Sequence, residues 1–103
     1  MNHGIPQNAV TAIINLFAMH PEIEKAILYG SRAKGNYKPG SDIDIALSGK
    51  NLTHEILSKI IIDLDDLLIP YTVDLSILEN ISNQELVDHI KRVGYPIFVS
   101  TKP

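Results

Sequence analysis

Apolar residues recur with the period of a helix in two long segments of the chain. Residues 6–19 form the first segment, which His20-Pro21 ends. Residues 53–68 form the second and clearer one, with Thr53 placed to cap its first turn. Its apolar stripe comprises Ile56, Leu57, Ile60, Ile61, Leu64 and Leu68. Both segments are therefore predicted to be amphipathic helices.

Shorter apolar or alternating runs separate these helices and are typical of strands. KAILY at residues 25–29 is one continuous apolar run, and IDIALS at residues 43–48 is a second. YTVDLSI at residues 71–77 alternates between apolar and polar positions, which predicts a third strand with two different faces. Residues 95–100 are suited to a short strand at the edge of the sheet.

A last helix is predicted near the C-terminus. Ser82-Asn83-Gln84-Glu85 has the sequence of a capping box, and the helix is expected to reach Val93 with Gly94 as its C-terminal cap. The order of elements is then helix, strand, strand, helix, strand, helix, strand. It predicts an α/β (α+β) fold for a single domain over residues 1–103, with a mixed sheet of about four strands and helices packed on it.

Composition and charge exclude several classes of protein. The chain has 103 residues and no cysteine, so neither a disulfide framework nor thiolate chemistry is expected. Neither an 18-residue apolar run nor a secretory signal is present, which predicts no membrane span and a cytoplasmic location. The net charge of −3 argues against direct binding of nucleic acid. Arg32, Lys34 and Lys38 nevertheless cluster within seven residues, which leaves room for a small anion site.

Three aspartates are predicted to share one face of the sheet. Residues two apart in a strand point the same way, so Asp42 and Asp44 lie on one face of the run at residues 43–48. Asp74 occupies the polar face of the run at residues 71–77. If the two strands are neighbours, the three carboxylates converge and repel one another. A hard divalent cation such as Mg²⁺ is the natural compensator for such a group.

Several more ordinary interpretations compete with a metal site. An isolated Asp-x-Asp near a turn is most often only solvated, and Asp74 alone would suit the surface of a half-exposed strand. The glycine and glutamate of a calcium-binding loop are absent. The four histidines show no ligand spacing, which argues against zinc. Three acidic residues of the second helix, Asp63, Asp65 and Asp66, are expected to form a solvated face.

A glycine-containing turn lies just upstream of the aspartates. Gly30-Ser31 directly follows a predicted strand, and residues 32–35 are compatible with the start of a short helix. Backbone N–H groups at such a turn can bind an anion, and glycine lets a phosphate approach the backbone. A P-loop would need lysine and a hydroxyl residue after Gly35, where this chain has Asn36. The turn, the nearby cations and the two aspartates together favour a phosphate site.

This arrangement resembles a known signature. Gly-Ser-Arg-Ala-Lys-Gly at residues 30–35, five intervening residues, and Ser-Asp-Ile-Asp-Ile at residues 41–45 look like the signature of the DNA polymerase beta-like nucleotidyltransferase superfamily. The match is closest to its minimal nucleotidyltransferase (MNT) branch and extends over most of the chain. One position departs from the pattern: the family usually has arginine where this chain has Lys34, which keeps the charge but loses the bidentate fork.

The resemblance implies transfer of a nucleoside monophosphate, with AMP from ATP as the first expectation, and release of pyrophosphate. It implies that Gly30 and Ser31 hold the terminal phosphates. Lys34 and, as a second candidate, Arg32 would neutralise phosphate charge.

The metal ligands are implied in the same way. Asp42 and Asp44 would bind two Mg²⁺ ions, which can clamp the attacking and leaving oxygens of such a transfer. Asp74 matches the third carboxylate, which ligates one ion and is a candidate to accept the proton of the acceptor hydroxyl.

The expected acceptor is a partner protein. Small members of the family that resemble this chain often pair with a helical HEPN-domain protein, and the resemblance implies an antitoxin that adds AMP to a tyrosine of a HEPN toxin. Two rivals stay open: a catalytically silent module that binds nucleotide or partner, and the nucleotide-binding subunit of a two-chain enzyme acting on a small molecule. Exposed edge strands would also permit self-association into a homo-oligomer.

Overall fold

The helices and strands follow one another in the predicted order. The short helix expected near residues 32–35 is present but begins at Gly30, and a 3-10 turn is added after the third strand. The computed structural model describes residues 3–100. The elements are α1 (Gln7–Ala18), β1 (Lys25–Tyr29), α2 (Gly30–Lys34), β2 (Ile43–Ser48), α3 (His54–Asp66), β3 (Val73–Ile77), η1 (Leu78–Asn80), α4 (Gln84–Val93) and β4 (Tyr95–Val99).

The four strands form one mixed sheet in the order β3-β2-β1-β4. β1 pairs antiparallel with both β2 and β4, whereas β2 pairs parallel with β3. A parallel pair needs a long crossover connection, and α3 provides it. The predicted α/β fold with a mixed four-stranded sheet is therefore confirmed, as is the place of β4 at an edge.

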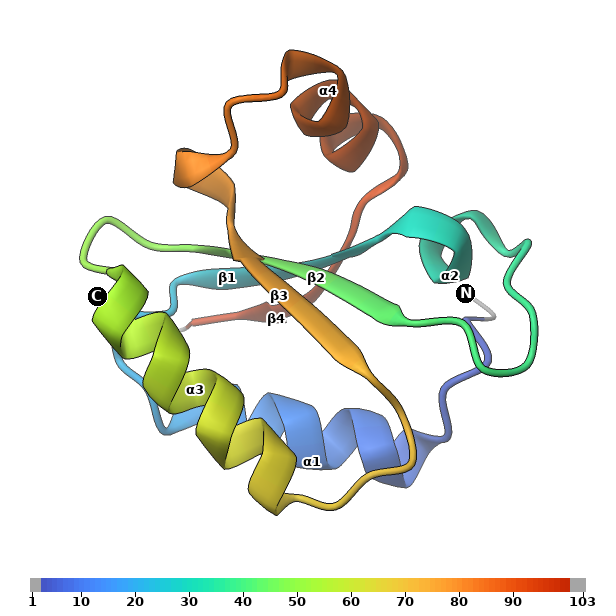
Figure 1. Cartoon of the computed structure of the whole chain (residues 1–103), viewed down its shortest axis with the longest axis horizontal. Coiled ribbons are helices and arrows are strands. Elements are labelled where there is room, and N and C mark those ends of the chain that lie inside the picture. The colour runs from blue at the N-terminus through green and yellow to red at the C-terminus, as the bar shows by residue number, and fades with distance from the viewer. Residues whose placement is uncertain (1–2, 101–103) are drawn as a thin grey trace.

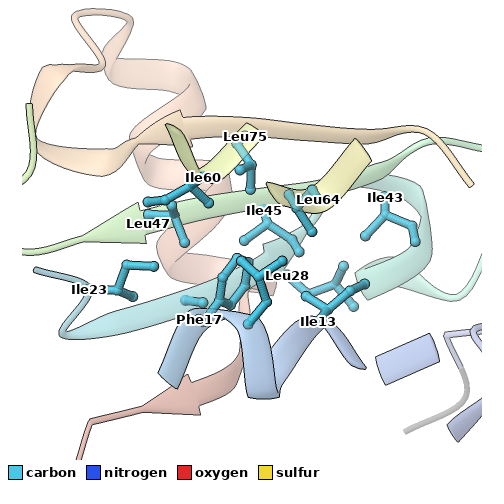
Figure 2. Packing of buried hydrophobic residues seen from close by; sticks show 12 residues of the cluster. Ile13, Phe17, Ile23, Leu28, Ile43, Ile45, Leu47, Ile60, Leu64 and Leu75 are labelled. Atoms are coloured by element: carbon cyan, nitrogen blue, oxygen red, sulfur yellow. The ribbon is translucent and has the colours of Figure 1, made fainter. Parts of the chain in front are cut away.

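Helices cover both faces of the sheet. α1 and α3 lie together on one face, and α4 lies on the other (Figure 1). The main core fills the space between the sheet and the helices α1 and α3, as Figure 2 shows. Its buried residues come from five elements and the turn before β1 and include Ile13, Phe17, Ile23, Leu28, Ile43, Ile45, Leu47, Ile60, Leu64 and Leu75. Within residues 3–100, no helix combines the length and apolar character that crossing a bilayer requires.

The second face of the sheet is not polar along its whole length, as the alternation alone had suggested. Ala46, on the same face of β2 as Asp44, is fully buried. It packs with Tyr29 of β1 and Ile90 of α4 in a second, smaller cluster. α4 therefore closes part of this face and leaves the aspartates beside the covered part.

Two predicted helix ends are confirmed and one is shifted. Thr53 caps α3, because its Oγ1 accepts a hydrogen bond from the Ile56 N–H at 3.2 Å. Gly94 is the C-cap of α4, and its N–H donates to the Ile90 carbonyl at 2.7 Å. The N-cap of α4 is Asn83, not Ser82 as the capping box predicted, because the Asn83 side-chain oxygen accepts the Leu86 N–H.

The predicted second helix is too long at its C-terminal end. α3 stops at Asp66 with Leu67 as its C-cap, and Leu68 takes the left-handed backbone conformation with φ of 54°. Leu68 is 88% exposed and so does not belong to the buried stripe. Pro70 explains the early stop, because it has no N–H to donate to the Asp66 carbonyl four residues earlier and its ring would clash with that carbonyl in a continued helix.

Candidate active site

The three aspartates meet at one end of the β2–β3 pair. Asp44 and Asp74 are direct partners in the parallel register. Asp42 lies two residues before Asp44, just outside β2, and its charge acts on the Asp44 carboxyl group. Asp42 and Asp74 are exposed, whereas Asp44 is half-buried. The expectation that β2 and β3 are neighbours, which the convergence required, is thus confirmed.

Asp44 has the most perturbed environment of the three. Burial raises the pKa of its carboxyl group above the ordinary value, and the negative charges of Asp74 and Asp42 raise it further. The positive charge that His89 carries when it is protonated lowers the pKa of Asp44. Negative charge at this place is therefore under-compensated in the protein itself, which is the condition that favours a bound cation.

Gly30 follows the last residue of β1 and lies directly beside this carboxylate. Its backbone is left-handed, with φ of 75°, and a Cβ at this position would collide with Oδ2 of Asp44. Any other residue would have to adopt an unfavourable backbone and displace the carboxylate. The left-handed turn from β1 into α2 therefore favours glycine, and a side chain at this position would also push the Asp44 carboxylate aside.

α2 carries the remaining predicted residues of the phosphate site. Ser31 is half-buried in its first turn, and Lys34 is exposed at its end. Gly35 caps the helix in the left-handed conformation, with φ of 84°. Lys34 is therefore free of packing constraints and accessible to a ligand.

Arg32 is placed differently from the expectation that it neutralises phosphate. Its side chain is buried, with 2% exposed. Nε and Nη2 donate to the Ser41 carbonyl at 3.1 and 2.9 Å, and Nη1 donates to the His3 carbonyl at 3.0 Å. The guanidinium carbon also lies 5.1 Å from the centre of the Tyr37 ring and 5.4 Å from that of Tyr71. Arg32 therefore ties α2 to the segment before Asp42, and a phosphate cannot reach it in this arrangement.

Three further residues border the site, and the sequence reasoning did not select them. Tyr29 is buried, and its hydroxyl lies 3.4 Å from the Ser76 Oγ. Burial raises the pKa of Tyr29; the hydrogen bond with Ser76 lowers it, and the charges of Asp44 and Asp74 raise it. His89 of α4 accepts a hydrogen bond from the Gly30 N–H. One signal for His89 was available, because it lies three residues after Leu86 on the inward side of α4.

The aspartates suit a metal ion by their chemistry. Carboxylate oxygens are the ligands that Mg²⁺ prefers, and their mutual repulsion is what a cation would relieve. Among residues 3–100, no three side chains of His, Cys, Asp and Glu are grouped as a preformed metal site. Asp42, Asp44 and Asp74 are the residues that could hold an ion here.

Solved structures share this fold. A chain in the crystal structure of a toxin-antitoxin with AMP-PNP matches with a TM-score of 0.70 and 22% identity, covering 94% of this chain and 76% of that one. A chain of the toxin-antitoxin MntA-HepT matches with a TM-score of 0.69 and 24% identity, covering 92% and 74%. A chain from the complex of a tri-AMPylated Shewanella oneidensis HEPN toxin with MNT antitoxin matches with a TM-score of 0.67 and 24% identity, covering 91% of this chain and 72% of that one.

A comparison with sequence models of families gives more direct evidence of family membership than these similarities in fold. No curated protein sequence matches the chain. The sequence model of the family described as "Polymerase beta, Nucleotidyltransferase" matches residues 11–102, which is most of the chain. That span includes the Gly30-Ser31 turn and all three aspartates. The chain therefore belongs to the polymerase beta nucleotidyltransferase family, and its predicted enzyme class, nucleotidyltransferase, is confirmed.

Proposed function

We propose that this nucleotidyltransferase moves AMP from ATP to a tyrosine hydroxyl of a HEPN-domain toxin and so acts as an MNT-type antitoxin. The observation that carries the proposal is the register of β2 and β3, which sets Asp44 opposite Asp74 beside the Gly30–Ser31 turn. Carboxylates for a cation and a glycine turn for phosphates are the two parts that nucleotidyl transfer needs in one place.

Each part of the site has a role in the proposed reaction. The acceptor oxygen attacks the α-phosphorus, the bond from that phosphorus to the bridging oxygen breaks, and pyrophosphate leaves. Lys34 offsets charge on the terminal phosphates. Ser31, at the start of the helix that follows the turn, helps to hold these phosphates. Asp74 is exposed and takes the proton of the acceptor hydroxyl.

The proposal includes two Mg²⁺ ions, held by Asp42, Asp44 and Asp74. When bound, they would neutralise charge on the reacting phosphate and orient the attacking and leaving oxygens. The raised pKa of Asp44 supports this assignment, because its cause includes the two neighbouring negative charges that a cation would offset.

The relatives support the choice of nucleotide and acceptor. One similar chain comes from a toxin-antitoxin structure with AMP-PNP, and another from a complex with a tri-AMPylated HEPN toxin. The bound AMP-PNP and the AMPylated toxin are features of those structures. For this chain, ATP and a HEPN partner are proposals, and a cytoplasmic location and self-association through β3 or β4 stay predictions.

The test is transfer of label from ATP carrying labelled α-phosphate, in the presence of Mg²⁺. The wild-type chain and Asp42→Asn are each incubated with and without the protein encoded beside this one. We expect label on that neighbour with the wild-type chain only. Asp65→Asn serves as the control, because Asp65 is an exposed aspartate of α3, which packs on the face of the sheet opposite α4.

Other outcomes select the rival functions. Label in the small-molecule fraction instead of on protein would indicate a subunit of a small-molecule transferase. Neither transfer nor Mg²⁺-dependent binding of ATP would indicate a silent module that pairs through its fold. Full activity of Asp42→Asn would remove the assigned role of Asp42.

A further inference from the structure

His89 of α4 reaches the turn that the proposed function assigns to phosphate. Its Nε2 accepts a hydrogen bond from the Gly30 N–H at 3.3 Å. Its ring also packs edge-on against Tyr29, the residue before Gly30, with 6.2 Å between the ring centres and 81° between the ring planes. α4 approaches the sheet from the face opposite α1 and α3 (Figure 1), so this contact joins two elements that are far apart in sequence.

Gly30 is consequently held from two sides. The Asp44 carboxylate fills the space where a Cβ would lie, and His89 holds the backbone N–H. The left-handed conformation of Gly30 therefore depends on β2 and α4 together. Since Gly30 leads directly into Ser31, these contacts also set the direction in which α2 leaves the sheet.

The chemistry of imidazole suits this position. The partner of Gly30 must be an acceptor, and a carboxylate there would add negative charge to a place where three carboxylates already gather. A neutral imidazole accepts the hydrogen bond through Nε2 without that charge. A neutral imidazole also does not repel the negatively charged triphosphate.

We propose that His89 is a positioning residue that fixes the Gly30–Ser31 turn in the conformation that binds the triphosphate. The inference rests on the proposed function. It changes one predicted role: in this structure the Gly30 N–H is used by His89, so Gly30 shapes the site while the phosphate contacts come from Ser31 and Lys34.

The test compares two replacements of His89 by affinity for Mg²⁺-ATP, measured by titration calorimetry. His89→Leu keeps apolar volume beside Tyr29 but cannot accept a hydrogen bond. His89→Gln places an amide oxygen near the position of Nε2 and can accept one. We expect His89→Leu to weaken binding about five- to tenfold, the usual size of one lost hydrogen bond. His89→Gln should stay within about twofold of wild type, and so should Asp88→Ala, an exposed neighbour on α4.

A second readout does not depend on nucleotide. Hydrogen exchange of the Gly30 amide, followed by NMR in the free protein, should be slow in the wild type and His89→Gln and faster in His89→Leu. Equal ATP affinities for all variants, or His89→Gln as weak as His89→Leu, would overturn the role of His89. A wild-type chain that binds no Mg²⁺-ATP would overturn the proposed function and the positioning role with it, whereas equal affinities with intact binding overturn the positioning role alone.

Discussion

Asp44 and Asp74 lie directly opposite each other across the parallel β2–β3 pair, so two like charges occupy adjacent positions on one face. Their repulsion is unfavourable for the folded protein, and burial of Asp44 adds to it, because its charged form loses hydration. A chain selected for stability alone would gain by neutralising one of them. The site therefore carries a stability cost that a bound cation would relieve.

The first prediction is that Asp44→Asn stabilises the free protein at neutral pH while abolishing nucleotidyl transfer. The folded pKa of Asp44 lies above its ordinary value of 3.8. Between that value and the folded pKa, the folded state keeps a proton that the unfolded chain has released, so stability falls as pH rises through this window. Asparagine has no proton to lose and escapes the fall.

Urea unfolding of both proteins from about pH 3 to about pH 7 checks this. The free energy of unfolding of the wild type should decline relative to Asp44→Asn from near pH 3.8 upward and then stay lower. Asp65→Asn, an exposed aspartate of α3, should show no such divergence. Parallel pH profiles for wild type and Asp44→Asn would contradict the assigned environment of Asp44.

The second prediction separates backbone strain from the close approach of Asp44. Gly30 and Gly35 both have positive φ, of 75° and 84°, but a Cβ would meet Asp44 only at position 30 and nothing within 4 Å at position 35. Gly35→Ala should therefore cost only the left-handed backbone, about 1–2 kcal/mol. Gly30→Ala should cost more and also abolish ATP binding, because the carboxylate must move.

Unfolding in urea and calorimetry with Mg²⁺-ATP measure the two effects. The informative quantity is the loss of ATP affinity, which we expect for Gly30→Ala and not for Gly35→Ala. Equal affinity losses in both variants would indicate that the contact between Gly30 and Asp44 does not matter for the nucleotide.

The convergence of the aspartates could be predicted because it depends on short-range geometry. Alternation with a period of two was the reason to place Asp42 beside Asp44. The observed β2 begins only at Ile43, but the charge of Asp42 still acts on the Asp44 carboxyl group. Because a helix connects β2 to β3, a parallel pairing of these two strands is the natural arrangement. One assumption, that β2 and β3 are adjacent, was enough to bring Asp74 to the same place, and the observed register agrees.

Contacts between distant segments could not be predicted in this way. The family resemblance made Arg32 a second candidate for neutralising phosphate, but its partners Tyr71 and His3 come from other parts of the chain. His89 showed no spacing to another ligand, and only the packing of α4 on the sheet brings it to Gly30. Local sequence gives the type of a side chain, whereas tertiary packing decides which side of the site it faces.

The third prediction concerns the end of α3. Leu68 is exposed and left-handed, with φ of 54°, so its side chain gains little from burial while its backbone is strained. Leu68→Gly should raise the free energy of unfolding by about 0.5–1 kcal/mol, because glycine adopts this conformation without a steric cost. Met19→Gly is the matched control: Met19 is also highly exposed but has φ of −79°.

Urea unfolding of the two variants gives the comparison directly. Met19→Gly should be neutral or destabilising, since glycine there only adds freedom to the unfolded chain. A destabilising Leu68→Gly would show that the exposed leucine makes a favourable contribution that outweighs its backbone strain.

The fourth prediction distinguishes two basic residues of α2 that lie two positions apart. Arg32→Met removes the donors to the Ser41 and His3 carbonyls from a buried place and should cost about 2–4 kcal/mol of stability. Lys34→Met removes an exposed ammonium group and should change stability by less than about 0.5 kcal/mol. The two substitutions therefore test whether burial, and not charge alone, decides if a basic residue of α2 stabilises the fold.

Affinity for Mg²⁺-ATP should show the opposite order, with the larger loss for Lys34→Met. Lys34→Met should weaken binding, with the loss shrinking at high salt because an exposed charge is screened. Lys34→Arg should keep the affinity, since arginine preserves the charge and adds a bidentate fork for phosphate. An Arg32→Met protein that stays as stable as the wild type but no longer binds ATP would return Arg32 to the phosphate site, and Arg32 would then have to leave its buried position when nucleotide binds.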